Sequence, residues 1–143
     1  MPQFTPFLAF DGNCAEAFDF YARVLGAQPP TYLRYTQIPG GCPPHIPAGD
    51  ADKVWYAKLN FEGSELHGCD TIAGGGGPYQ PPRSIDIVLQ FDTAERAQQV
   101  FQAFAEGGEI KMPIQKADWA EAFGMLRDRF GIEWMINGAQ VQP

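Results

Sequence analysis

The sequence predicts an α+β fold made of two βαβββ modules. An apolar run followed by residues at helical spacing occurs twice, and the change from strand to helix is Phe10-Asp11 in one place and Phe91-Asp92 in the other. Three strand-like runs follow each predicted helix, and residues 123–137 read as two apolar strands joined by a short polar turn. Such an internal repeat predicts helices packed on the outer face of each sheet, with the other sheet faces lining a shared cavity.

The first module begins with the apolar run 4–10. Asn13 is a good N-cap, and Glu16 stands at capping-box spacing from it. Apolar residues then recur at helical spacing up to Leu25, and Gly26 fits a helix stop. Three strands are expected at residues 31–36, 53–61 and 64–70, the last two joined by a hairpin turn at Glu62-Gly63.

The second module repeats this order. Residues 84–91 alternate between apolar and polar, which is typical of a strand. Asp92 and Glu95 repeat the capping spacing, and Gly107-Gly108 is expected to end the second helix. Strands are expected near residues 109–114, 120–127 and 131–137.

Two segments rich in Pro and Gly depart from the repeat. Residues 37–52 are expected either to cover a cavity mouth or to form a plain loop between strands, with His45 in solvent. Residues 71–83, with four glycines at 74–77, are expected to link modules of about 1–72 and 83–143. At 143 residues and 45% hydrophobic content, residues 1–143 are expected to form one domain.

The composition excludes several kinds of partner. A net charge of −7 and an isoelectric point near 4.6 oppose binding to nucleic acid or to an anionic membrane surface. No apolar run approaches the roughly 20 residues that span a bilayer, so we expect a cytoplasmic protein without a membrane partner. Three widely spaced cysteines, Cys14, Cys42 and Cys69, suit reduced thiols. Cys14, near a helix start, is expected to be structural rather than reactive.

The alternation of side chains along the strands predicts which residues line the cavity. Tyr56, Lys58 and Asn60 share one strand face, whereas the apolar residues between them suit burial under a helix. Lys58 is expected to hold an anionic group or to reach water. Gln90 extends the polar set beside Asp86. Trp134 is expected in the core, and Trp119 is expected either to stack on a ligand or to pack at a hairpin or dimer contact.

The chain resembles the vicinal oxygen chelate superfamily of glyoxalases, bleomycin-resistance proteins and extradiol dioxygenases, and within it the PhnB-like branch. The residues that carry this resemblance are 10–21, 24–27, 63–66, 105–108 and the hairpin 119–137. The resemblance implies that the two modules form a glyoxalase-like open barrel, and it also implies a homodimer.

Metalloenzymes of this superfamily place ligands on the first and last strands of each module. Matching the flanking residues puts those positions at Pro6, His67, Asp86 and Met135. Only His67 and Asp86 suit zinc, nickel, manganese or iron, although alternation leaves Glu133 as a shifted third ligand. His67 is otherwise expected to be a buried imidazole satisfied by a neighbour such as Asp86, or to form an acid and base pair with it. No cofactor is firmly implied.

Three functions remain open, and the sequence does not decide whether the protein is an enzyme. The first is a small-molecule binding protein without a full metal site, with Tyr56, Lys58, His67, Asp86, Gln90, Trp119 and Met135 lining the cavity. The second is a divalent-metal-assisted lyase, isomerase or dioxygenase-like enzyme using His67, Asp86 and Glu133. The third is a dimeric scaffold with a vestigial cavity. The ubiquinone-pathway methyltransferase label often given to this branch is rejected, because the run of four glycines at 74–77 is followed by Pro78 instead of a helix.

Overall fold

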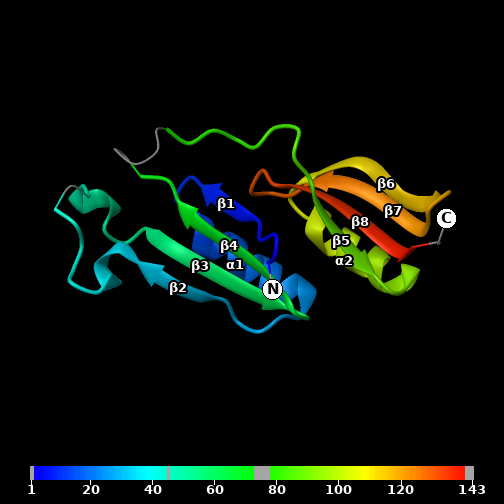
Figure 1. The fold of residues 1–143 in the computed structure, drawn as a ribbon. Helices are drawn as coiled ribbons and strands as arrows, with labels where there is room; N and C mark the ends of the chain where they lie inside the picture. Colours follow the sequence, from blue (N-terminus) through cyan, green and yellow to red (C-terminus); the bar gives the residue numbers. More distant parts are fainter. Residues whose placement is uncertain (1, 45, 73–77, 141–143) are drawn as a thin grey trace. The chain divides into compact units, whose positions relative to one another are not determined.

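The computed structural model describes residues 2–44, 46–72 and 78–140. It divides into two compact units, residues 1–80 and 81–143. Figure 1 shows that each unit has its own sheet and its own long helix. His45 and the glycines at 74–77, for which the sequence predicts a solvated side chain and a linker, lie outside the described residues. No described helix has the length and apolar character needed to cross a membrane.

The first unit is a four-stranded mixed sheet with the strand order β1-β4-β3-β2. Strand β1 runs parallel to β4, whereas β3 is antiparallel to both β4 and β2. Its elements, in chain order, are β1 (Phe7–Phe10), α1 (Cys14–Leu25), β2 (Thr31–Arg34), the 3-10 turns η1 (Tyr35–Gln37) and η2 (Ala48–Asp50), β3 (Val54–Phe61) and β4 (Ser64–Asp70).

The second unit repeats the topology with the strand order β5-β8-β7-β6. Strand β5 is parallel to β8, and β7 is antiparallel to both β8 and β6. Its elements are β5 (Ile87–Phe91), α2 (Ala94–Ala105), β6 (Glu109–Ala117), β7 (Ala120–Arg127) and β8 (Glu133–Gln140). The predicted α+β fold of two βαβββ modules is therefore confirmed.

Several predicted boundaries need correction. Strands β1 and β5 begin three residues later than expected, and β2 ends at Arg34 because η1 follows it. Asn13 precedes α1, but its side chain accepts no capping hydrogen bond, so the predicted capping box is wrong. The cap of α2 is Thr93 instead of Asp92, because the Thr93 hydroxyl accepts the Arg96 N–H.

The hairpin turn between β3 and β4 lies where the sequence places it. Glu62 and Gly63 have φ angles of 47° and 86°, and this pair of left-handed residues is what a two-residue type I′ turn requires. The turn sets the register in which Lys58 pairs with His67 and Asn60 with Glu65. It thereby puts four polar side chains on one face of the sheet.

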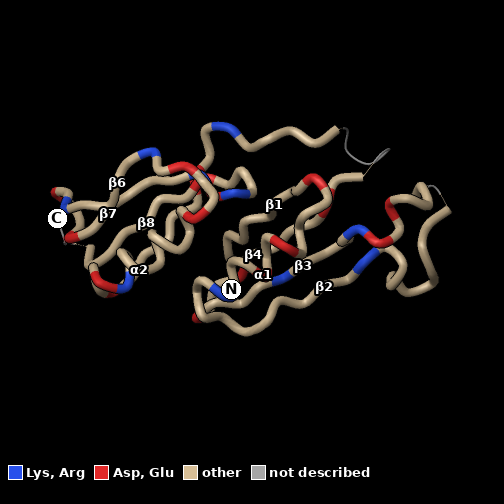
Figure 2. The backbone as a smooth tube through the Cα atoms, turned by 180° about the vertical axis from the view of Figure 1, so that it is seen from behind, with Lys and Arg blue, Asp and Glu red and all other residues tan. Residues whose placement is uncertain are grey.

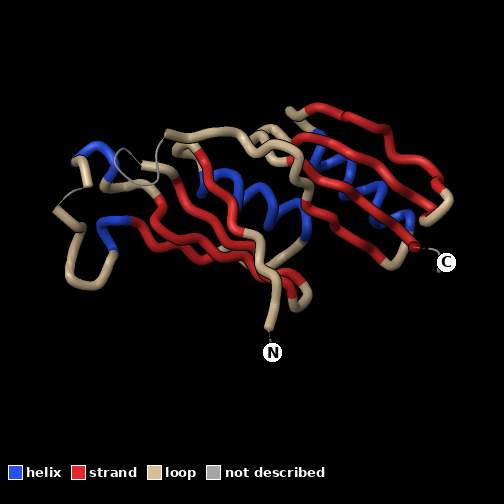
Figure 3. Tube along the Cα trace, turned by 45° about the horizontal axis from the view of Figure 1, so that its top comes forward, coloured by secondary structure: helices blue, strands red, loops and turns tan. Residues whose placement is uncertain are grey.

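Each helix covers one face of its own sheet, as Figure 3 shows. Helix α1 packs on β3 and β4, and α2 packs on all four strands of its sheet. The buried side chains under the helices include Ala57 and Leu59, as the alternation predicts, and Trp134, which is 1% exposed. A Cβ added at Gly68 would lie 2.9 Å from the Phe18 ring, so glycine there lets α1 approach the sheet closely.

A buried carboxylate joins three elements of the first unit. Asp70, at the end of β4, is 3% exposed. One carboxylate oxygen accepts the Cys14 N–H at the start of α1, and the other accepts the Val54 N–H at the start of β3, each at 2.9 Å. The Cys14 N–H is one of the helix donors that have no partner within the helix. Asp70 therefore fixes where α1 begins relative to the sheet.

Replacing Asp70 with Asn is expected to lower the free energy of unfolding by about 2–3 kcal/mol, because the amide nitrogen cannot accept a hydrogen bond and leaves a buried N–H without a partner. The measurement is urea unfolding followed by circular dichroism. Asp11→Asn, in the exposed turn before α1, is the matched control and should change stability by less than about 0.5 kcal/mol. Equal effects of the two substitutions would contradict the role given to Asp70.

Candidate functional site

The helix-free face of the first sheet carries a cluster of ionisable side chains. Cross-strand pairing aligns Phe7, His67, Lys58 and Thr31 in one row over β1, β4, β3 and β2. Glu65 lies two residues before His67, and Tyr56 two residues before Lys58, so both point to the same side as the row. We call Tyr56, Lys58, Glu65 and His67 the His67 group.

The imidazole of His67 is held on two sides. Its Nε2 atom lies 2.9 Å from a Glu65 carboxylate oxygen. The Tyr56 hydroxyl lies 3.2 Å from Nδ1 and 3.4 Å from Nε2, with the two rings nearly perpendicular. The other Glu65 oxygen lies 3.5 Å from the Lys58 ammonium. All four side chains are only partly buried, so they form a connected network that solvent still reaches.

This geometry defines the hydrogen-bonding role of each nitrogen of the His67 imidazole. A carboxylate accepts hydrogen bonds only, so Nε2 carries the proton that Glu65 receives, and Nδ1 is left as the basic nitrogen of the neutral ring. The hydrogen bond from His67, together with the charge of Lys58, lowers the pKa of Glu65 and keeps it ionised. Nδ1 in turn accepts from the Tyr56 hydroxyl, so the hydroxyl oxygen is the atom of the His67 group that can accept from a ligand.

The prediction that Tyr56, Lys58 and His67 share one face agrees with this arrangement. Lys58 is half-exposed and pairs with Glu65, so it reaches water while keeping an anionic partner. Glu65 and Tyr56 satisfy His67 within the first unit. Asp86 belongs to the second unit, so its pairing with His67 stays a prediction.

The second sheet presents a different helix-free face. The row equivalent to Phe7, His67, Lys58 and Thr31 consists of Val88, Met135, Met125 and Met112 on β5, β8, β7 and β6. The next row in the sheet contains Gln90, Asn137, Phe123 and Gln115. Trp119 lies in the turn between β6 and β7, where its ring meets Phe123 edge-on at 5.0 Å, so it forms a hairpin contact.

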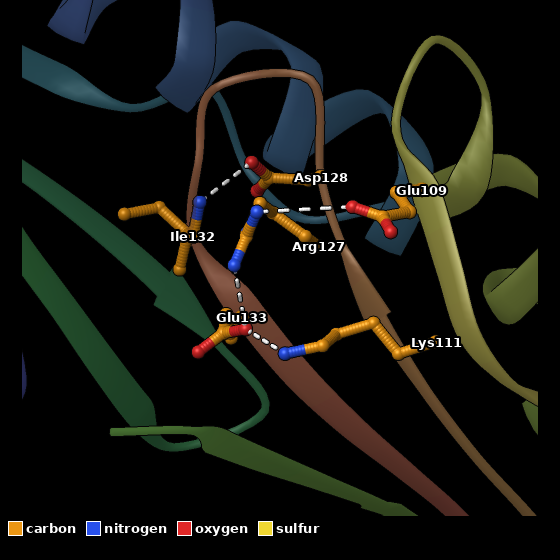
Figure 4. A network of polar contacts seen from close by, with 6 residues as sticks. All are labelled: Glu109, Lys111, Arg127, Asp128, Ile132 and Glu133. Atoms are coloured by element: carbon orange, nitrogen blue, oxygen red, sulfur yellow. Dashed lines mark hydrogen bonds and ion pairs between the residues drawn. The ribbon is translucent and has the colours of Figure 1, made fainter. Parts of the chain in front are cut away.

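A charged network closes one end of this second face, as Figure 4 shows. The Glu133 carboxylate, 5% exposed, is paired with Lys111 and with Arg127, and Arg127 also lies 3.7 Å from Glu109. The hydrogen bond from Lys111, reinforced by Arg127, lowers the pKa of Glu133 despite its burial. Sequence reasoning placed Glu133 beside Met135 but missed both cations, because they come from neighbouring strands.

The turn after Arg127 is held by a second buried carboxylate. Asp128 accepts the N–H groups of Phe130 and Ile132 and the indole N–H of Trp134, at 2.8, 3.0 and 2.8 Å. This turn places Glu133 opposite Arg127 in the register of β7 and β8. The network is therefore positioned by the backbone as well as by charge.

The side chains that could bind a metal do not form a cluster within the described residues. Among residues 2–44, 46–72 and 78–140, no group of three His, Cys, Asp or Glu side chains could hold an ion. The backbone oxygen of Pro6 accepts the His67 N–H at 3.0 Å, and Glu133 is already paired with two cations. His67 lies in one unit and Asp86 and Glu133 in the other, so the set of these three as ligands stays a prediction.

Acidic and basic positions are dispersed over both units, as Figure 2 shows. Along the described backbone, most Lys and Arg positions are separated by stretches of other residues. The net charge of −7 lies on many separate side chains. That the ligand is not an anionic polymer stays a prediction from the net charge.

Two βαβββ modules, each with one sheet face free of its helix, define a protein of the glyoxalase-like fold class. The chain belongs to the family described as 3-demethylubiquinone-9 3-methyltransferase, whose model matches residues 2–137. It is 30% identical to Protein YjdN of Escherichia coli over 146 residues, which is 97% of each chain. The resemblance to PhnB-like proteins is thereby confirmed.

Solved structures agree with this assignment. Protein PA1353 from Pseudomonas aeruginosa is 35% identical with a TM-score of 0.84, covering 96% of this chain and 98% of its own. A Bacillus cereus PhnB protein, titled a 3-demethylubiquinone-9 3-methyltransferase, is 24% identical with a TM-score of 0.73, covering 96% and 100%. A glyoxalase, bleomycin-resistance and dioxygenase domain from Frankia has the same fold at 11% identity and a TM-score of 0.61, covering 96% and 90%.

The family name states a methyl transfer that the described fold does not suggest. Its strands form two four-stranded mixed sheets, whereas the nucleotide-type sites that hold S-adenosylmethionine use a glycine-rich turn in a doubly wound parallel sheet.

The lowered pKa of Glu133 predicts a pH dependence of stability. The unfolded chain, with a glutamate pKa of about 4.3, binds a proton at a higher pH than the folded chain does. The contribution of Glu133 is therefore full above about pH 5.5 and is lost as the pH falls through the lower folded value. Urea unfolding at pH 3 to 6 should show a shallower pH slope for Glu133→Gln than for the wild type or for the exposed control Glu121→Gln. An unchanged slope would show that the ion pairs are not formed in solution.

The cysteines supply a second prediction. Cys14 is buried, and desolvation raises the pKa of its thiol far above the usual value. Cys42 and Cys69 are partly exposed. In the native protein, Ellman's reagent should modify Cys42 and Cys69 and leave Cys14 intact, while all three react in denaturant. Peptide mass analysis identifies each site, and rapid native labelling of Cys14 would show that it is a reactive thiol after all.

Proposed function

We propose that the protein binds an oxygen-bearing small molecule through the His67 group. The observation that carries the proposal is the placement of His67, which Glu65 and Tyr56 orient on a sheet face that the helix does not cover. An imidazole that Glu65 and Tyr56 hold in place also orients the Tyr56 hydroxyl, whose oxygen can still accept a hydrogen bond from a ligand hydroxyl.

The surroundings of His67 support a ligand with both polar and apolar parts. Phe7 is the cross-strand neighbour of His67 and is 56% exposed, so an aromatic surface lies beside the polar network. Lys58 adds a cation and Tyr56 a hydroxyl. Small-molecule sites commonly combine a few fixed polar groups with apolar walls. The Frankia structure is titled a glyoxalase, bleomycin-resistance and dioxygenase domain, names that refer to small-molecule substrates and drugs.

The test begins with a thermal-shift screen of 1,2-diols, α-hydroxyketones, phenols and small carboxylates. The Kd of each hit is then measured by calorimetry for the wild type, Tyr56→Phe and His67→Gln. Loss of one hydrogen bond to the ligand should weaken binding about tenfold. Asn60→Ala, at an exposed position on the same strand face, is the matched control and should bind as the wild type does.

Two results would overturn the proposal. The first is the lack of any hit in the screen, and the second is undiminished binding by His67→Gln. A separate titration with zinc, nickel, manganese and ferrous iron tests the alternative of a metal-assisted lyase, isomerase or dioxygenase-like enzyme. One ion bound per chain and lost in His67→Ala would replace the metal-free proposal with that alternative.

A further inference from the structure

We propose that the helix-free face of the second sheet is a subsite for a neutral, planar aromatic group that bears one N–H or O–H donor. This proposal rests on the proposed function, because it assigns a ligand class to the same protein, but it involves a different unit and different residues. Three independent features lead to it: a row of methionines, an aromatic pair beside that row, and an asparagine oxygen without a donor.

The methionine row consists of Met112, Met125 and Met135, which are direct cross-strand neighbours on β6, β7 and β8. The chain has four methionines, so the row holds all but the N-terminal one. These side chains are not part of the core under α2, because Leu126, Trp134 and Ile136 occupy the opposite face of the same strands. Met112 is 40% exposed. Val88, which continues the row on β5, is 45% exposed.

Thioethers favour aromatic ligands. Methionine is unbranched and polarisable, so it adapts to a flat surface and makes favourable sulfur–aromatic contacts. Four side chains on adjacent strands, each about 4.8 Å apart, give a strip about 14 Å long. This length accommodates a ring system of one or two fused rings. An apolar body of that size is therefore the simplest occupant of the strip.

The aromatic pair widens the strip on one side. Phe123 is two residues from Met125 and shares its face, and Trp119 meets the Phe123 ring at 5.0 Å with an interplanar angle of 74°. Phe123 is 8% exposed, whereas Trp119 is 48% exposed. Trp119 thus leaves ring surface available next to the methionine row, and edge-to-face contact with a further ring is favourable.

The asparagine defines the polar group of the ligand. Asn137 is the cross-strand neighbour of both Phe123 and Gln90. Its Oδ1 atom is buried and accepts no hydrogen bond within the described part of the chain. A buried carbonyl oxygen without a donor is destabilising, so native structures nearly always satisfy it. Because Oδ1 has no exposed surface, a ligand N–H or O–H would supply the donor once the Asn137 side chain turns toward the aromatic pair.

The charged network explains why the expected ligand is neutral. Lys111 and Arg127 both pair with Glu133, and Arg127 also pairs with Glu109. Two cations and two anions balance at this end of the face, so no charge is left that requires a ligand counterion. The ligand class is therefore one that phenol and indole represent.

The test uses these two probes and their methylated forms. The protein is labelled with [methyl-13C]methionine, and the methyl signals are assigned with single Met→Leu variants. Indole is expected to shift the signals of Met112, Met125 and Met135 saturably. It should bind about tenfold more tightly than 1-methylindole, which has no N–H, because one hydrogen bond is lost. Phenol and anisole should show the same order.

Variants separate this subsite from the His67 group. Asn137→Leu keeps the approximate side-chain volume and should remove the preference for indole over 1-methylindole. Ile110→Ala is the matched control, because Ile110 is an exposed apolar residue that pairs with the core residue Leu126, on the opposite face of the sheet. His67→Gln should leave indole binding unchanged, so failure of the proposed function and failure of this subsite give different results.

Three results would overturn the subsite. One is the absence of saturable shifts in the methionine row. Another is equal affinity of the wild type for indole and 1-methylindole, a comparison that stands even if Asn137→Leu fails to fold. The third is movement of the row signals with protein concentration alone, which would show that a second copy of the chain covers this face.

Discussion

The structure depends on one constraint: a single helix can cover only one face of a four-stranded sheet. In each unit the helix packs so closely that glycines are needed beneath it, since a Cβ at Gly68 would meet Phe18 and one at Gly138 would lie 2.5 Å from the Ala97 Cβ. Close packing of this kind fixes which side of every strand is core. The remaining side of each sheet is not needed for the core, so its residues are free to take other roles.

Two buried carboxylates, those of Asp70 and Asp128, fix where helices and strands begin along the chain. Asp70 ties the starts of α1 and β3 to the end of β4, and Asp128 shapes the turn before β8. Both satisfy backbone donors that would otherwise be buried without a partner. The register of β3 with β4 and of β7 with β8 follows from these turns, and the composition of the two helix-free faces follows from the register. Positions of functional side chains thus depend on residues that cannot touch a ligand.

The sequence predicted the parts of this arrangement that follow from periodicity. Alternation placed Tyr56, Lys58 and Asn60 on one face and Trp134 in the core, and the pair Glu62-Gly63 between two strand-like runs predicted the hairpin. It could not identify hydrogen-bond partners across strands: the Lys111 and Arg127 partners of Glu133 depend on register, and β6 contains irregularities that period-2 reasoning does not foresee. The predicted N-cap of α2 was wrong for a related reason. Asp92 and Thr93 are both good N-cap residues, and only the backbone geometry selects Thr93.

Equivalent positions of the repeat carry different side chains in the two units. His67 corresponds to Met135, Lys58 to Met125, and Glu65 to Glu133, because each pair has the same place in the strand order and register. The glutamate is present in both units, yet it orients an imidazole in the first and neutralises two cations in the second. The first face carries an imidazole beside a carboxylate and a phenol, and the second carries three thioethers beside an amide oxygen that accepts no hydrogen bond among the described residues. The duplicated units therefore share a topology and a register but differ in the chemistry of their helix-free faces.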